Sequence, residues 1–180
     1  MNRAGLWIVW LLMVLLSTNA LAQMSQENRS MLVETVTRQY LLSKPTNMPA
    51  HALPLVISLH GDGGNAAGMR NSLRIEDRSN NGAVFVYLKS AGNAFEYWSS
   101  AGRAHEGLFV QQLISTLHAE LAIDTSRVYL VGFSGGATMA NALGCRLGRN
   151  VIRGVGIHSG TLYPVNGDFG YTDNGGVTCD

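Results

Sequence analysis

Hydrophobic runs of strand length alternate along this chain with segments of helical periodicity. Strand-type runs are expected at five places, namely residues 35–42, 52–60, 82–88, 128–133 and 152–160. Helical patterns lie between them at residues 65–75, 105–122 and 134–148. Continuous apolar runs, such as that at 52–60, are typical of strands buried on both faces. Strands separated by helices in this way predict one α/β domain with a mostly parallel sheet and flanking helices.

The first 22 residues have a different pattern, which is that of a secretory leader. Arg3 precedes an apolar stretch of about eleven residues, too short for the roughly 20 that span a bilayer. The segment ends in ALA at 20–22, which signal peptidase accepts. We therefore expect residues 1–22 to be a signal peptide and residues 23–180 a secreted domain, extracellular or periplasmic, with no stable membrane insertion. An uncleaved membrane anchor is the alternative.

Composition adds one exclusion. The 180 residues are 46% hydrophobic and 14% charged, which suits one globular domain with a core. The formal net charge is +1, and no run of basic residues interleaves with aromatic ones. The sequence therefore does not indicate nucleic-acid binding.

The first candidate for chemistry lies where the run at 128–133 passes directly into a helical pattern. Ser134 stands there, within the sequence GFSGG. Glycines two positions before and after the serine relieve crowding in a strained strand-to-helix turn, and the helix N-terminus favours developing negative charge. These features predict that Ser134 is a catalytic nucleophile. The alternative is a tight turn in which the serine only caps the helix.

A glycine-rich loop with the sequence LHGDGGN at 59–65 follows the run at 52–60. Acyl transfer needs two N–H donors for the carbonyl oxygen that becomes negative. We predict the backbone N–H groups of Gly135 and Asp62 for this oxyanion hole, with the Asp62 carboxylate turned away. His60 is expected to pack locally. A phosphate-binding loop is the alternative, but the sequence lacks both the P-loop lysine and a G-x-G-x-x-G pattern. No metal or cofactor is expected.

Three segments in this order, LHGDGGN (59–65), VYLKSAGNAFEYW (86–98) and IDTSRVYLVGFSGGATMANAL (123–143), resemble secreted α/β-hydrolase esterases. The nearest branch is that of polyhydroxybutyrate depolymerases and feruloyl esterases. The resemblance implies an α/β-hydrolase fold, a polymeric or aromatic ester as substrate, and a place for Trp98 at the substrate pocket. Two features depart from the family pattern, because relatives often carry paired aspartates at 105–106 and a Pro-Asp-Gly turn in place of SAGNAFEYW.

The two cysteines are Cys145, in the helical pattern after Ser134, and Cys179, in the glycine-rich tail. An isolated pair in an exported protein most often forms a disulfide, and the family resemblance implies this pairing. By restricting the unfolded chain, the bridge would stabilise the fold by about 3–4 kcal/mol. Two unrelated thiols are the alternative.

The groups that would activate Ser134 do not occur in the chain order that this fold uses, which is serine, acid, histidine. His158 is the only histidine after Ser134, and it precedes every later acid, namely Asp168, Asp173 and Asp180. His158 is an alternative base in an unfamiliar position. We therefore expect the sequence to be the N-terminal part of an esterase, with the last strands, the acid and the histidine missing.

The sequence as a whole predicts a secreted serine esterase that acts on a polyhydroxybutyrate-type polyester or a feruloyl-type ester through an acyl-serine intermediate. This fragment is expected to be inactive alone. The alternative function is that of a secreted binding module on a hydrolase scaffold that has lost catalysis. The intact GFSGG turn favours the enzyme, since a binding module has no need of a strained serine.

Overall fold

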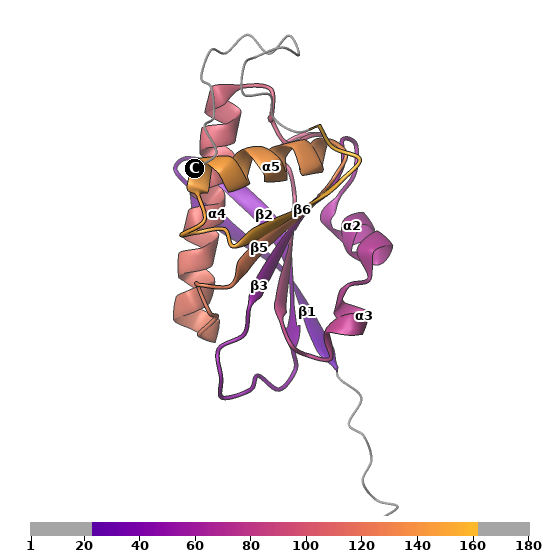
Figure 1. The fold of residues 1–180 in the computed structure, drawn as a ribbon, viewed down its shortest axis with the longest axis vertical. Coiled ribbons are helices and arrows are strands. Elements are labelled where there is room, and N and C mark those ends of the chain that lie inside the picture. The colour runs from indigo at the N-terminus through magenta and orange to yellow at the C-terminus, as the bar shows by residue number, and fades with distance from the viewer. Residues whose placement is uncertain (1–22, 162–180) are drawn as a thin grey trace, which may run out of the picture.

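The computed structural model describes residues 23–161, which form a six-stranded sheet with helices on both faces (Figure 1). The strands are β1 (Met24–Val33), β2 (Val36–Pro45), β3 (Leu55–Leu59), β4 (Val84–Leu88), β5 (Val128–Phe133) and β6 (Gly154–His158). Their order across the sheet is β1-β2-β4-β3-β5-β6. The proposed signal peptide and the last strands expected from the resemblance lie outside the described residues.

Four of the strands are parallel, and the other two form a hairpin at one side of the sheet. Strand β3 lies at the centre, where Ile57 pairs with Val86 of β4 and with Leu130 of β5. Strand β2 joins β4 in antiparallel orientation, and β1 pairs with β2. At the other side, the described part of β6 pairs only with β5. The sheet is therefore mostly parallel, as predicted.

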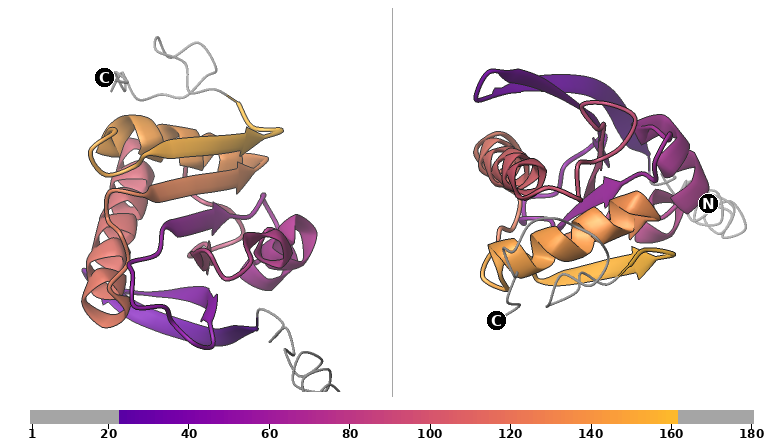
Figure 2. Two further views of the ribbon diagram at one scale, coloured as in Figure 1. Left: turned by 60° about the horizontal axis from the view of Figure 1, so that its bottom comes forward. Right: turned by 90° about the horizontal axis from the view of Figure 1, so that it is seen from above.

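The helices form a layer on each face of this sheet (Figures 1 and 2). Helices α4 (Ser100–Leu121) and α5 (Gly135–Leu147) contact each other and cover one face. Helices α2 (Ala66–Leu73) and α3 (Glu76–Ser79) lie on the opposite face. Within residues 23–161, no helix combines the length and apolar character that crossing a bilayer requires.

The central strands are apolar throughout because both of their faces are buried. On β4, the side chains of Val84, Val86 and Leu88 belong to the core beneath α4 and α5. The alternate residues Phe85 and Tyr87 belong to a smaller core beneath α2. The continuous hydrophobic run of β4 is therefore explained by burial of both faces of the strand, as predicted.

Three elements differ from the sequence-based expectation. The short helix α3 lies past the end of the helical pattern expected at 65–75 and was not predicted. Strand β1 was not expected, because the MSQENRSMLV sequence at 24–33 is mostly polar; it lies at the sheet edge, where polar side chains meet water. Helix α4 begins at Ser100, five residues before the expected start, because the Ser99 hydroxyl accepts a hydrogen bond from the Gly102 N–H (2.9 Å). This side-chain cap compensates for the weak hydrophobic pattern of the first turn.

The parallel strands direct the loops after β3, β4, β5 and β6 to one edge of the sheet. Residues 60–65, 89–99 and 134 all lie at this edge, although they are distant in sequence. In open α/β sheets, ligands bind outside the carboxyl ends of the strands. This edge is therefore where a functional site is expected.

Candidate active site

The turn between β5 and α5 holds Ser134 in a conformation that side chains rarely adopt, with φ 51° and ψ −124°. Its N–H donates to the His158 carbonyl oxygen (2.9 Å), and its own carbonyl oxygen accepts from the N–H groups of Ala137 and Thr138. Neighbouring backbone therefore fixes the turn. Strained residues of this kind persist only where the surrounding structure holds them in place, and they cluster at active sites.

Glycines let the new helix lie against the sheet directly behind the serine. A Cβ atom on Gly132 would overlap the backbone of α5. One on Gly136 would overlap the carbonyl oxygens of Leu59 and His60, at the end of β3. The glycines that the sequence analysis associated with the turn are therefore required by close backbone contact.

The loop after β3 lies beside the nucleophile. A Cβ atom on Gly61 would lie 3.1 Å from the Ser134 Cβ atom. The loop is held at its far end, where the N–H of Gly63 donates to the Asn93 carbonyl oxygen (2.6 Å). The predicted oxyanion loop and the predicted nucleophile are thus neighbours.

The two predicted oxyanion donors are available for binding. The Gly135 N–H is the first of α5, where no intrahelical acceptor exists. Neither this group nor the Asp62 N–H has an acceptor in the part of the chain that the structure describes. Their role in binding an oxyanion stays a prediction.

The Asp62 side chain departs from expectation, because its carboxylate does not turn away from this corner. One oxygen occupies the space that a Cβ atom on Gly135 would fill. The other accepts a hydrogen bond from the Tyr97 hydroxyl (3.0 Å). The missing side chain of Gly135 and the donor on Tyr97 together explain why the carboxylate lies here.

His60 packs locally, as predicted. Its ring is buried and lies 4.8 Å from that of Phe95, measured between ring centroids. Its Nδ1 is 2.7 Å from the Gly61 carbonyl oxygen, and its Nε2 accepts from the Ser90 N–H (3.3 Å). This pattern requires a neutral ring with the proton on Nδ1. With both nitrogens engaged, His60 joins the ends of β3 and β4 and does not serve as a base.

His158 lies beside the nucleophile through its backbone, whereas its side chain packs elsewhere. The imidazole stacks on the Phe133 ring, 5.4 Å away between centroids, and its Nδ1 is 3.0 Å from the Ser159 hydroxyl. Within residues 23–161, no imidazole forms a hydrogen bond with the Ser134 hydroxyl. The described part of the chain therefore does not place a base on the serine.

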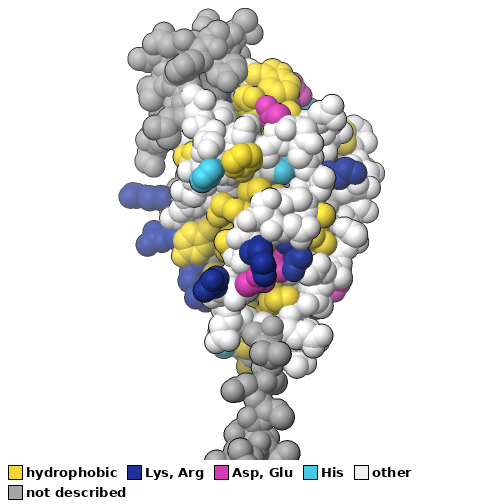
Figure 3. Space-filling view, turned by 90° about the vertical axis from the view of Figure 1, so that its right-hand side faces the viewer, with side chains coloured by type: hydrophobic (Ala, Val, Ile, Leu, Met, Phe, Trp, Pro, Cys, Tyr) yellow, Lys and Arg dark blue, Asp and Glu magenta, His cyan; other side chains and the backbone are white. Residues whose placement is uncertain are grey.

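A cavity of about 520 Å³ opens beside Ser134, between α2 and the ends of β5 and β6. Such a volume suits a small ligand or one end of a larger one. Its apolar lining comes from three residues that the sequence analysis did not identify, Met69, Leu73 and Phe133. Figure 3 faces the side of the molecule that carries α2 and α3, where hydrophobic side chains show among polar ones.

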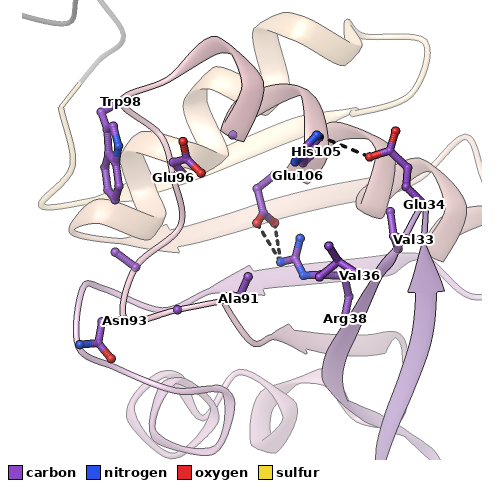
Figure 4. A pocket seen from close by; sticks show the side chains of 13 residues that line it. Val33, Glu34, Val36, Arg38, Ala91, Asn93, Glu96, Trp98, His105 and Glu106 are labelled. Atoms are coloured by element: carbon purple, nitrogen blue, oxygen red, sulfur yellow. Dashed lines mark hydrogen bonds and ion pairs between the residues drawn. The ribbon is translucent and has the colours of Figure 1, made fainter.

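Trp98 lines a second cavity, of about 380 Å³, near the start of α4 (Figure 4). Its ring is 45% exposed and packs edge-to-face on Tyr97, with 5.1 Å between centroids. Tyr97 contacts both Asp62 and Gly135. The Tyr97 side chain therefore lies between Trp98 and the predicted oxyanion hole. Its role in a substrate pocket stays a prediction. Phe95, which precedes Tyr97 and Trp98 in the same loop, is fully buried and packs against the His60 ring.

An ion pair between Arg38 and Glu106 lies under this second cavity and was not predicted. The Arg38 Nη2 atom is 2.8 and 2.9 Å from the two Glu106 carboxylate oxygens, and both side chains are almost fully buried. Burial raises the pKa of Glu106, and the guanidinium opposes this effect. The sequence offers no local signal of this pair, because Glu106 stands beside the polar residues Arg103 and His105.

Cys145 lies on α5. Cys179 lies outside the described residues, so the disulfide between them stays a prediction.

Comparison with known proteins gives consistent findings. The sequence profile of the family described as "Esterase PHB depolymerase" matches residues 38–168. A probable feruloyl esterase C from Aspergillus clavatus is 31% identical over 117 residues, which cover 60% of this chain and 41% of that protein. A poly(3-hydroxyalkanoate) depolymerase C from Paucimonas lemoignei is 32% identical over 107 residues, 55% of this chain and 26% of that protein. Each match spans less than two thirds of the relative's length.

Solved structures share the fold. The acetyl xylan esterase from Aspergillus awamori matches with a TM-score of 0.62 at 15% identity, over 76% of this chain and 52% of that one. At this low sequence identity, the structural similarity is evidence for the fold alone. It confirms the predicted α/β-hydrolase fold.

Proposed function

This chain belongs to the esterase PHB depolymerase family, and we propose that it is a secreted serine esterase with Ser134 as its nucleophile. The observation that carries the proposal is the strained turn at Ser134, placed between the end of β5 and the N-terminus of α5. The nearby N–H groups of Gly135 and Asp62, which lack acceptors in the described residues, support it.

In the proposed reaction, the Ser134 oxygen attacks the ester carbonyl carbon while its proton passes to a histidine. The carbonyl oxygen becomes negative and accepts hydrogen bonds from the N–H groups of Gly135 and Asp62. The C–O bond to the alcohol then breaks, and the histidine returns the proton to the departing alcohol oxygen. Water, deprotonated by the same histidine, releases the acid and regenerates the serine.

We propose that this histidine, and the acid that orients it, come from outside the printed sequence. His60 has both ring nitrogens engaged, and the His158 ring stacks on Phe133. The other three histidines lie away from Ser134 in the fold: His118 near the C-terminal end of α4, bonded to the Ile123 carbonyl oxygen, His105 paired with Glu34, and His51 in the loop before β3.

The substrate is proposed to be a carboxylic ester of the kinds named for the relatives, a feruloyl ester or a poly(3-hydroxyalkanoate). The cavity beside Ser134 suits the acyl part, because Met69, Leu73 and Phe133 give it apolar walls. Export through the leader at residues 1–22 would bring the enzyme to such extracellular polymers. No cofactor takes part in the proposed reaction.

One observation favours the alternative of a secreted binding module. Within residues 23–161, the Ser134 hydroxyl has no hydrogen bond to an imidazole, and a serine hydroxyl without a base is a poor nucleophile. A module of this kind would keep the cavities but lack turnover.

A fluorophosphonate probe, which reacts covalently with activated serines, separates the two functions. We expect it to label the natural secreted protein, in which the proposed histidine is present, and we expect Ser134→Ala to abolish labelling there. The matched control is Ser72→Ala, a serine that lines the cavity beside Ser134, and this variant should label like the parent. Labelling that persists in Ser134→Ala would refute the assigned nucleophile. A parent protein that does not label would favour the binding module.

A further inference from the structure

Strand β1 has unpaired backbone groups along one side, at the edge of the sheet. The Gln23 carbonyl oxygen accepts from the Thr46 N–H (2.9 Å), so the odd-numbered positions of β1 direct their backbone groups toward β2. The even-numbered positions therefore direct theirs away from the sheet, and these are Met24, Gln26, Asn28, Ser30 and Leu32. Within residues 23–161, β1 pairs with β2 alone. Such an edge can bind a further strand.

The strand lacks the usual protection of an exposed edge (Figure 2). Its pairing with β2 runs without a bulge from Met24 to Val33, and its ten residues include no proline. Natural edge strands are often short, bulged or interrupted by proline, which prevents pairing with another chain. Leu32 is also 65% exposed, more than any other large hydrophobic residue among residues 23–161. These features suit association through β1.

The charged residues of β1 decide which strand fits against it. In antiparallel pairing with a second copy of β1, even-numbered positions lie opposite even-numbered ones, because only these have free backbone groups. A two-fold axis at Asn28 meets this condition and places Glu27 opposite Arg29 of the second copy, on both sides of the axis. An axis at Glu27, or one at Arg29, would place that residue opposite itself. Like charges directly opposite each other destabilise a sheet.

The same register brings apolar residues together at both ends of the paired strands. Leu32 lies opposite Met24 of the second copy, and both side chains lie on the same face of the sheet because even-numbered positions share one face. Met24 packs against the smaller core beneath α2. The exposed Leu32 side chain would therefore be covered by an extension of that core.

The charges next to the axis are already held in place in the single chain. The Arg29 guanidinium contacts the carboxylates of Glu27 (2.7 Å) and of Glu120 on α4. Lys44 Nζ lies 3.7 Å from the other Glu27 oxygen. The Arg29 and Glu27 side chains remain 27% and 39% exposed. They can therefore contact a second copy with little further loss of side-chain freedom.

We propose that the protein forms a homodimer in which two β1 strands pair antiparallel about an axis at Asn28, so that the two sheets become one. Each pair of even-numbered residues then exchanges backbone hydrogen bonds. Ser134 follows β5, on the far side of the central strand β3 from this interface. Both candidate active sites therefore stay open, at opposite ends of the dimer, and the inference does not depend on the proposed function.

Charge reversal at the axis tests the interface. Analytical ultracentrifugation of the natural secreted protein should show a reversible, concentration-dependent dimer. Glu27→Arg and Arg29→Glu each bring like charges together across the axis, and each should raise the dimer dissociation constant roughly tenfold or more. Mixed in equal amounts, the two variants should associate again, because each supplies the charge that the other has lost. Circular dichroism checks that both are folded.

Arg149→Glu is the matched control for these reversals. Arg149 is exposed in the loop between α5 and β6, at the opposite side of the sheet from β1. This variant should leave the dissociation constant unchanged. Leu32→Ala should weaken the dimer roughly tenfold, because it removes the apolar contact with Met24 at both ends.

Cysteine cross-linking tests the register. Two copies of Asn28→Cys would meet at the axis, where Cα atoms about 5.5 Å apart allow a disulfide. Ser30→Cys is the control, because each copy lies opposite Gln26 and the two positions are about 13 Å apart along the strands. On a non-reducing gel, Asn28→Cys should give a dimer, whereas Ser30→Cys should give a single chain.

Four results would overturn the proposal: a single chain at every concentration, a dimer that neither charge reversal weakens, reversed variants that do not associate when mixed, or equal cross-linking of both cysteine variants. Serine labelling is measured separately, and Glu27→Arg should label at Ser134 like the parent. Labelling without a dimer would refute this interface alone, and a dimer without labelling would refute the esterase reaction alone.

Discussion

Ser134 has a backbone conformation that few side chains adopt, and its immediate neighbours explain why it can do so. The absent side chains of Gly61 and Gly135 leave room around it. In the second of these spaces lies the Asp62 carboxylate, held by the Tyr97 hydroxyl. At the scale of single residues, the site therefore includes a negative charge close to the place where an oxyanion would form.

That charge leads to a prediction about Asp62→Asn. Like charges repel across a few ångströms even in a partly wet site, so neutralising the carboxylate should stabilise the oxyanion. The Tyr97 hydroxyl can still donate to the asparagine side chain. We expect the second-order rate constant for labelling by a neutral fluorophosphonate to rise roughly threefold to tenfold.

Asp77→Asn provides the control, because it removes an exposed carboxylate on α3, far from this corner in the fold. Its labelling rate should match that of the parent. A slower rate in Asp62→Asn would show that the carboxylate assists the reaction.

At the scale of elements, the strand–turn–helix unit of β5 and α5 is constrained by backbone proximity. A single residue, Ser134, separates the end of β5 from the start of α5, and the helix lies against the carbonyl groups at the end of β3. Such contact leaves no volume for a Cβ atom. The same packing that stabilises the sheet also aims the α5 N-terminus at the site.

Gly136→Ala should therefore be strongly destabilising, although alanine is the better helix former. The new Cβ atom would overlap the carbonyl oxygens of Leu59 and His60, and overpacking costs about 1–3 kcal/mol or more. Urea unfolding followed by circular dichroism measures the change in the free energy of unfolding. Gly92→Ala is the matched control, since it has no atom within 4 Å of its Cβ position. Equal stability of the two variants would contradict the packing argument.

At the scale of the whole molecule, the hairpin and the helical layer are joined by the Arg38–Glu106 pair. Arg38 belongs to β2 and Glu106 to α4, and their side chains meet where almost no water reaches them. Burial raises the pKa of Glu106, and Arg38 works against this. Removing the cation would leave an acid without its counter-charge inside the protein.

We predict that Arg38→Met lowers the free energy of unfolding by roughly 3–5 kcal/mol. In the folded variant, the pKa of Glu106 would lie above its ordinary value of 4.5, whereas in the unfolded chain it would return to that value. The folded variant would therefore keep this proton at pH values where the unfolded chain has already released it. Stability should consequently fall as the pH rises above 4.5. Denaturant unfolding at several pH values tests this. In Arg38→Met with Glu106→Leu, most of the loss and the pH dependence should disappear; a double variant as unstable as the single one would refute the explanation.

The mass of the secreted protein tests the predicted processing and disulfide together. Cleavage after Ala22 should reduce 19.4 kDa to roughly 17 kDa. Reduction should then add about 2 Da if Cys145 and Cys179 are bridged. An intact mass near 19.4 kDa would indicate a retained leader. A mass several kilodaltons larger would mean that the natural protein extends past Asp180, as expected if the acid and the histidine lie there.

Much of the fold was predictable because its elements have strong local patterns. The apolar runs of β3, β4 and β5 and the GFSGG turn can be recognised without knowledge of their partners. Strand β1 was not predictable, because its polar sequence becomes a strand only by pairing with β2. The early start of α4 depends on a single capping hydroxyl.

The sequence by itself determined the order of the four parallel strands and of the helices α2, α4 and α5, the position of the candidate nucleophile and the family resemblance. These depend on periodicity and on residues that are adjacent in the chain. Only the tertiary structure decided that Asp62 contacts Tyr97, 35 positions away, and that Arg38 pairs with Glu106, 68 positions away. Such contacts depend on which loops the parallel strands bring to one edge. No local pattern encodes them, because they exist only once the sheet has formed.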